Sequence, residues 1–179
     1  PTGEISASAG YGTSGQTFSF GIKENNFGGN ATKLNTNLSI TSKSLKGGFN
    51  VIIPNYKYSD KSLRVNLSRT SNDFLSTSGY ENTITNFTIG TRFEYKKDLF
   101  FTPLIALEAE ELTTDSTASS SLKKQDGNYN NIELDYSFLY DKRDRSFRPT
   151  DGYYSSFNQT LPLISNDYSL SNSYEYKTY

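Results

Sequence analysis

The residues best placed to do chemistry are three carboxylates, Glu108, Glu110 and Glu111, which lie within four positions of one another. In an extended segment Glu108 and Glu110 share one face, so they could line a lumen or face a loop. A carboxylate pair works as acid and base only beside a nucleophile, an arginine clamp or a histidine. This pair has no such support, and the chain contains no His. We therefore predict that the protein is not an enzyme.

The composition excludes several other kinds of site. Without Cys there is no disulfide framework and no thiolate metal site, and without His the commonest metal ligand is missing. The stretch "DGNYNN" (126–131) is rich in oxygen ligands, but it lacks the spacing of an EF-hand calcium loop and is interpreted as a turn. We predict no metal and no cofactor. The net charge of -1 leaves no basic face for nucleic acid.

The densest group of charges is "YDKRDRSFRPTDGYY" (140–154), in which seven charged residues accompany a proline and a glycine. Two interpretations are open for it. The first is a solvated turn whose Arg143, Arg145 and Arg148 pair with Asp141, Asp144 and Asp151. The second is a direct contact with a partner subunit. The first is favoured because opposite charges are already interspersed within the stretch.

Around these residues the dominant pattern is an alternation of apolar and polar residues, which is typical of half-buried β-strands. An apolar stripe with helical spacing occurs nowhere. About ten strands are expected, near residues 4–11, 18–23, 33–40, 49–53, 63–67, 87–95, 99–109, 132–140, 153–163 and 168–176. The connectors are rich in Gly, Pro, Asn and Asp. The longest connector, 113–128, has no periodicity and is predicted to be a mobile surface loop.

Ten strands in consecutive hairpins predict either a soluble sandwich or barrel with its apolar face inward, or a membrane barrel with that face outward. Two features favour the membrane. The strands are expected to have about 9–12 residues, near the roughly 9–11 that a tilted strand needs to cross a bilayer. Aromatic residues also stand at strand ends, where interfacial girdles form. These residues are Tyr11, Tyr56, Tyr58, Tyr95, Tyr140, Tyr153 and Tyr154.

Two motifs resemble the barrel of the BamA-like outer-membrane assembly factors, a family of the bacterial surface antigen superfamily. The opening stretch "GEISASAGYGTSGQTFSFGIKENNFGGN" (3–30) is similar to that family's first two strands and the turn after them, although Gly28 stands where a bulky residue, often Leu, is usual. The family's turn after the eighth strand has the residue order found here in Asp141, Arg143, Asp144, Pro149, Thr150, Gly152 and Tyr153.

The resemblance implies an all-β fold, an antiparallel up-and-down transmembrane β-barrel with sixteen strands. Residues 1–179 would supply about ten of them. We therefore expect a partial barrel domain from a longer protein, with upstream periplasmic repeats and the closing strands absent. We also expect that these ten strands do not fold alone, because an open sheet exposes two long edges. The charged stretch would be a periplasmic turn at the lower rim.

The resemblance also implies a function, which is the insertion and folding of β-barrel proteins into the bacterial outer membrane. A client's terminal strand would pair with the first strand at a lateral gate, which would comprise Glu4, Ile5, Ser6, Ala7, Ser8, Ala9, Gly10 and Tyr11. Expected partners are outer-membrane lipids, unfolded β-barrel clients and periplasmic lipoprotein subunits. The alternatives are a secretion or autotransporter-assembly transporter of the same superfamily, a passive porin, and a soluble adhesion sandwich.

Overall fold

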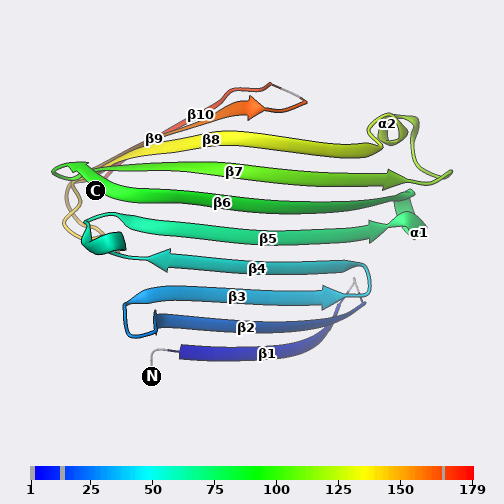
Figure 1. Cartoon of the computed structure of the whole chain (residues 1–179), viewed down its shortest axis with the longest axis horizontal. Coiled ribbons are helices and arrows are strands. Elements are labelled where there is room, and N and C mark those ends of the chain that lie inside the picture. The colour runs from blue at the N-terminus through cyan, green and yellow to red at the C-terminus, as the bar shows by residue number, and fades with distance from the viewer. Residues whose placement is uncertain (1–2, 13–14, 167) are drawn as a thin grey trace.

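The computed structural model describes residues 3–12, 15–166 and 168–179, which form one ten-stranded antiparallel sheet in chain order (Figure 1). The strands are β1 (Gly3–Gly12), β2 (Gly15–Phe27), β3 (Thr32–Thr41), β4 (Ser44–Ile53), β5 (Ser62–Phe74), β6 (Tyr80–Lys96), β7 (Leu99–Thr114), β8 (Gly127–Asp141), β9 (Tyr153–Ile164) and β10 (Ser171–Thr178). Three short helices, η1 (Tyr56–Tyr58), α1 (Leu75–Ser78) and α2 (Ser120–Lys123), lie in connections. The predicted all-β, up-and-down topology is confirmed.

Two details differ from the sequence-based prediction. The final strand begins at Ser171, three residues later than its alternating pattern suggested. The connector 113–128 was expected to lack regular structure, which is wrong for much of its length. Its ends belong to β7 and β8, and its middle forms α2, where the Ser119 side chain caps the helix by accepting a hydrogen bond from the Leu122 N–H. Ser and Thr favour such caps, so a Ser/Thr-rich stretch can hide a helix start.

The strand register places the apolar residues on one face of the sheet and the polar residues on the other. Phe20 is opposite Leu38, and Phe49 is opposite Leu67. Across β6–β9 the same face continues through the pairs Phe87 with Leu107, Ile105 with Leu134, and Phe138 with Phe157. We call this the apolar face and the opposite side the polar face.

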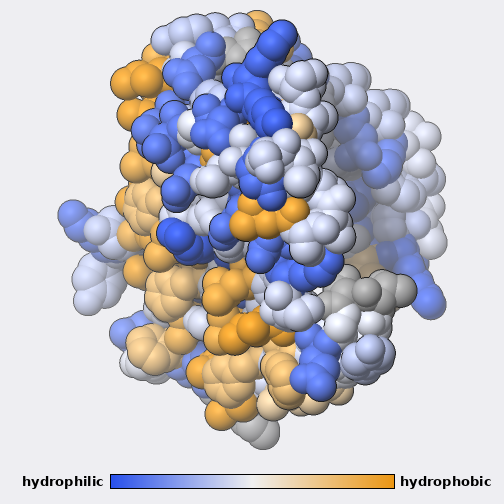
Figure 2. All heavy atoms as spheres, turned by 90° about the vertical axis from the view of Figure 1, so that its right-hand side faces the viewer, coloured by the Kyte–Doolittle hydropathy of each residue, from blue (hydrophilic) through white to orange (hydrophobic). Residues whose placement is uncertain are grey.

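The apolar face is not covered by a second layer. Phe18 is 56% exposed, Phe49 43% and Ile89 41%, whereas Leu112 and Ala118 are the buried apolar side chains among the described residues. In Figure 2 hydrophobic side chains gather along the left margin, which is the side that faces the viewer in Figure 1. A soluble domain would bury this face against another layer. An exposed apolar face beside a polar one is the arrangement of a membrane barrel wall.

The apolar face also shows that the strands are tilted. Register partners connect Ile5 on β1 to Ile132 on β8 through one row of residues. From that row the apolar stretch of β1 runs toward Tyr11, whereas that of β8 runs in the opposite direction, toward Tyr140. The apolar band thus shifts by about one residue per strand. With a rise of ~3.3 Å per residue and a strand spacing of ~4.8 Å, this shift corresponds to a tilt of roughly 35°.

Strands β5–β8 continue beyond the apolar band at the end that carries α1 and α2 (Figure 1). On the apolar face their outer parts carry polar side chains such as Arg69, Thr85 and Glu111. Leu112 and Ala118 are buried at this end, each 7% exposed. The Asp115 N–H donates to the carbonyl of Gly79, which ties the β7–β8 connection to the β5–β6 connection. We call this region the β5–β8 cap.

In the described ranges, no helix is long and apolar enough to span a membrane.

The register generates a stability prediction. Ile89→Arg should lower the free energy of unfolding of the protein in lipid vesicles by about 2–4 kcal/mol, because it places a charge on the apolar face near the middle of the band. Thr88→Arg is the matched control, since its side chain projects from the polar face. We expect a smaller loss for it, as measured by denaturant titration. Equal losses for both variants would contradict the assignment of the two faces.

Candidate functional site: the free edge of β1 and the charged turn

Strand β1 brings the eight residues Glu4 to Tyr11 into one row at an edge of the sheet. Among the described residues it pairs with β2 alone, through ten register pairs from Gly3–Glu24 to Gly12–Gly15. Every residue of β1 is exposed, including Ile5 at 72% and Tyr11 at 86%. The pairing of a client with this strand stays a prediction.

The free edge of β1 is a template for another strand. In an antiparallel sheet, alternate residues direct their N–H and C=O groups toward one neighbour and the others toward the opposite side. Half of the main-chain groups of β1 therefore point away from β2. An extended segment placed beside β1 would satisfy them with ladder hydrogen bonds.

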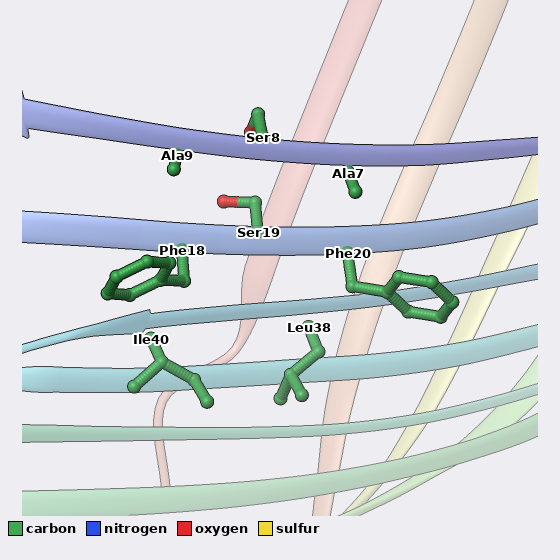
Figure 3. Close-up of a pocket in the computed structure, with 8 residues that line it drawn as sticks. All are labelled: Ala7, Ser8, Ala9, Phe18, Ser19, Phe20, Leu38 and Ile40. Atoms are coloured by element: carbon green, nitrogen blue, oxygen red, sulfur yellow. The ribbon is translucent and has the colours of Figure 1, made fainter.

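The side chains of β1 are small where those of β2 and β3 are large. Ala7 lies opposite Phe20 and Ala9 lies opposite Phe18. Phe20 and Phe18 in turn lie beside Leu38 and Ile40 of β3. The difference in size leaves a groove of ≈ 480 Å³ along the apolar face next to the free edge (Figure 3). The last strands pass behind the sheet in that view, on the side away from the rings.

The side chains of β1 are also small on its polar face. Ser6 and Ser8 are opposite Gly21 and Ser19, so this part of the β1–β2 ladder has no large side chain on that face. Separation of two strands loses ladder hydrogen bonds and the dispersion contacts of their side chains, and small side chains have few contacts to lose. The β1 edge is therefore weakly held by side-chain packing.

The charged turn between β8 and β9 is held by a carboxylate at its centre. Asp144 accepts hydrogen bonds from the Thr150 N–H at 3.0 Å, the Thr150 hydroxyl at 3.0 Å and the Asp151 N–H at 3.4 Å. These donors stabilise the charged form, so they hold the pKa of Asp144 below its ordinary value, and Arg145 adds to the effect. The residues of the predicted motif are thus brought together in one compact turn.

The pairing predicted for the turn is confirmed in part. Arg143 forms a bidentate pair with Asp141, at 2.8 Å and 2.7 Å, and Arg145 lies 3.5 Å from Asp144. Arg148 was expected to pair with a carboxylate, but its guanidinium lies 5.3 Å from the ring centroid of Phe147, and its carbonyl accepts a hydrogen bond from Arg145. In the described chain no ion pair includes Asp151, whose carbonyl instead accepts a hydrogen bond from the Asp144 N–H.

Gly152 and Tyr153 close the turn. Gly152 has φ +96°, and a Cβ atom there would lie 2.1 Å from the Lys142 carbonyl oxygen, so only glycine fits. The Lys142 N–H donates to the Tyr153 carbonyl at 2.8 Å. Pro149 follows Arg148, which has a left-handed φ of 49°. One further contact was not predicted from the sequence. The Lys142 ammonium group forms an ion pair at 2.6 Å with Asp98, which lies in the neighbouring β6–β7 turn.

The carboxylates Glu108 and Glu110, which were considered as a possible acid–base pair, lie within β7. Glu108 and Glu110 share the polar face as expected. Glu108 accepts a hydrogen bond from Asn131 at 3.1 Å, and Glu110 accepts one from Asn82 at 2.9 Å. Asp126 accepts from the N–H and the hydroxyl of Thr114, both at 2.7 Å, so it fastens the turn that begins β8. Each of these acids has a structural partner across the sheet.

Comparisons with known proteins extend the description. Residues 26–179 match the family model of the Omp85 superfamily domain. One matching solved structure is that of BamA from Haemophilus ducreyi lacking POTRA domains 1–3, with a TM-score of 0.64 and 19% sequence identity. The match covers 92% of this chain and 35% of that chain, so this chain spans about a third of the length of the matched protein. No curated protein matches the sequence.

The geometry at Gly152 predicts a large effect of a small substitution. Gly152→Ala should destabilise the folded protein by more than about 1 kcal/mol, because the methyl group would collide with main chain and the positive φ would be strained. Gly47→Ala is the matched control, since an added Cβ there meets only Leu38 at 3.9 Å. Thermal unfolding in lipid would measure both variants. A Gly152→Ala variant as stable as the control would contradict the turn geometry.

The depressed pKa of Asp144 predicts a dependence on pH. A carboxyl group with a lowered folded-state pKa stabilises the turn above its unfolded value of about 4, and this contribution is lost as the pH falls through the folded value. Protection of the Thr150 and Asp151 amides against hydrogen exchange, corrected for the intrinsic rate, should therefore fall below about pH 4. Asp144→Asn should remove most of this dependence, whereas Asp60→Asn, in another turn at the same end, should keep it.

Proposed function

Because this chain belongs to the Omp85 superfamily, we propose that the protein containing it inserts and folds β-barrel proteins in the membrane where it resides. It is a bacterial outer-membrane protein. The free edge of β1 would be the lateral gate, at which the terminal strand of an unfolded client pairs with Glu4 to Tyr11. Outer-membrane lipids and client proteins would be its direct partners, with periplasmic lipoprotein subunits as further expected partners.

One observation supports this proposal, which is that β1 has small side chains while those of β2 and β3 beside it are large. When its outer edge is open, β1 would supply the main-chain donors and acceptors that an incoming strand needs. Each ladder hydrogen bond contributes a net ~0.5–1.5 kcal/mol in water, and an unmade one in hydrocarbon costs more. A client strand in the bilayer therefore gains most from pairing where an edge is free.

The small side chains of β1 support the second half of the cycle, which is release. A client must leave once its own barrel has closed, so its attachment to β1 has to be exchangeable. Ala7, Ala9 and the facing serines provide few side-chain contacts, so main-chain hydrogen bonds dominate the attachment. The client's own strands can replace these bonds one by one. Large interlocking side chains on β1 would hold the client in place.

We propose no covalent step in this process. The driving force is the difference between unpaired and paired strands in an apolar medium, which needs no nucleophile, metal or cofactor. The carboxylates Glu108 and Glu110 are assigned to the wall, because each is bonded to an asparagine of a neighbouring strand.

A cysteine-crosslinking experiment tests the gate. The described chain contains no Cys, so single cysteines can be introduced without background from it. In the full-length protein, Ser6→Cys and Ser8→Cys should form disulfides with cysteines in the terminal strand of a stalled client. The yield should alternate with client position, because strand pairing has a fixed register.

Ser68→Cys is the matched control, since Ser68 lies on the polar face of β5, which is paired on both sides. Yields at Ser6 and Ser8 no higher than at Ser68 would reject the gate. In that case a transporter of the same superfamily or a passive porin becomes the better account.

A further inference from the structure

Lysines at the end of the sheet with the charged turn lie against aromatic rings of the apolar face. The Lys61 Nζ is 5.0 Å from the ring centroid of Phe93, and the Lys142 Nζ is 5.8 Å from that of Tyr140. Lys96 pairs in register with Leu99, and its Nζ is 5.9 Å from the Tyr95 centroid. These three ammonium groups lie along the border of the apolar band. At such a border the aromatic rings can lie in the lipid while the charged ammonium groups reach the water.

Two of the rings under these lysines, Phe93 and Tyr140, each belong to a group of aromatic rings in contact. Phe93 contacts Phe101 with centroids 5.8 Å apart, and Phe101 stacks on Phe138 at 4.6 Å. The ring of Tyr140 contacts that of Tyr153 at 5.8 Å. Both groups are part of the apolar face, which is exposed to the hydrocarbon. The lysine heads therefore stand at the depth of the lipid headgroups, on the outside of the barrel wall.

Two of these three lysines, Lys61 and Lys96, have no ion-pair partner within the described chain. Lys142 pairs with Asp98, but no carboxylate lies within ion-pair distance of Lys61 or Lys96 there. The connections at this end, 28–31, 54–61, 97–98 and 142–152, contain seven basic and four acidic residues. The connections at the opposite end, 13–14, 42–43, 75–79, 115–126 and 165–170, contain three of each. The excess positive charge is thus confined to one rim.

We propose that this rim is a binding surface for anionic phospholipids, in which Lys61 and Lys96, supported by Lys142, hold the phosphate groups of headgroups in the adjoining leaflet. We name the three residues the lysine border. A phosphate diester is the anion that reaches this depth from the lipid side, whereas a periplasmic protein would approach from the water beyond the turns. The ammonium groups offer three donors each, and the rings beneath keep them from folding back into solvent.

The surface would hold the β4–β7 wall at a fixed depth and enrich anionic lipid around it. It goes beyond the proposed insertion of clients, and it does not depend on the gate, since the lysine border is far from β1 in strand order.

Lipid-selective fluorescence quenching tests this proposal. The chain has no Trp, so Tyr95→Trp in the full-length protein, with any other tryptophans replaced by Phe, reports on the lysine border. In vesicles that contain brominated phosphatidylglycerol, quenching should exceed that by brominated phosphatidylcholine. The relative binding constant should fall on the order of fivefold for each lysine removed in Lys61→Gln and Lys96→Gln, and it should also fall with ionic strength.

Two controls make the result specific. Leu45→Trp reports from the opposite end of the apolar face and should show no preference for the anionic lipid. Lys43→Gln with Lys123→Gln removes the same charge at that end and should leave the preference at Tyr95→Trp unchanged. Equal quenching by the two lipids at Tyr95→Trp, or a preference that survives removal of Lys61 and Lys96, would overturn the proposal.

A second measurement avoids the tryptophan variant, in case it does not fold. Spin-labelled phosphatidylglycerol should show a larger motionally restricted fraction with the otherwise unaltered protein than with the Lys61→Gln, Lys96→Gln variant. Spin-labelled phosphatidylcholine should not distinguish the two proteins. No difference between the two proteins with the anionic lipid would also overturn the proposal.

Discussion

The structure depends on the pairing of main-chain groups within an apolar layer. A strand in hydrocarbon has no water to satisfy its N–H and C=O groups, so each must be bonded to a neighbouring strand. Nine consecutive ladders accomplish this for every strand from β2 to β9. In the β1–β2 ladder the side chains of β1 are small, so main-chain hydrogen bonds dominate that ladder. The side chains then decide how easily a new strand is accepted and released.

The alternation of side chains explains why so much of the architecture could be predicted from the sequence. In a single-layer wall each residue faces either lipid or the interior. The alternation of Phe18 and Phe20 with Ser19 therefore indicates directly which residues of β2 lie on each face. The strand order followed from short connections between neighbours. The weak side-chain packing of β1 could also be predicted, since Ala, Ser and Gly bury little surface. Client pairing at that edge remains a prediction.

Other features depend on relations between strands that no single segment records. The tilt emerges only when the apolar stretches of β1 and β8 are compared through the register. The pairing of Lys142 with Asp98 joins two turns that are 44 positions apart by their residue numbers, which sequence spacing cannot indicate. Within the charged turn, composition suggested three ion pairs, but Arg148 adopted a left-handed φ and lies on Phe147. The local main-chain path, rather than charge alone, selects the partners of each arginine.

The β5–β8 cap has a mechanical consequence. Its buried residues Leu112 and Ala118 lie beyond the apolar band, together with charged side chains such as Arg69 and Glu111. At the opposite end the same four strands begin or end in the connections 54–61, 97–98 and 142–152, which also carry charged residues. The four strands therefore carry charged residues at both ends, on either side of the apolar band. Moving these strands along their axes in either direction would carry charged side chains into hydrocarbon, which costs free energy.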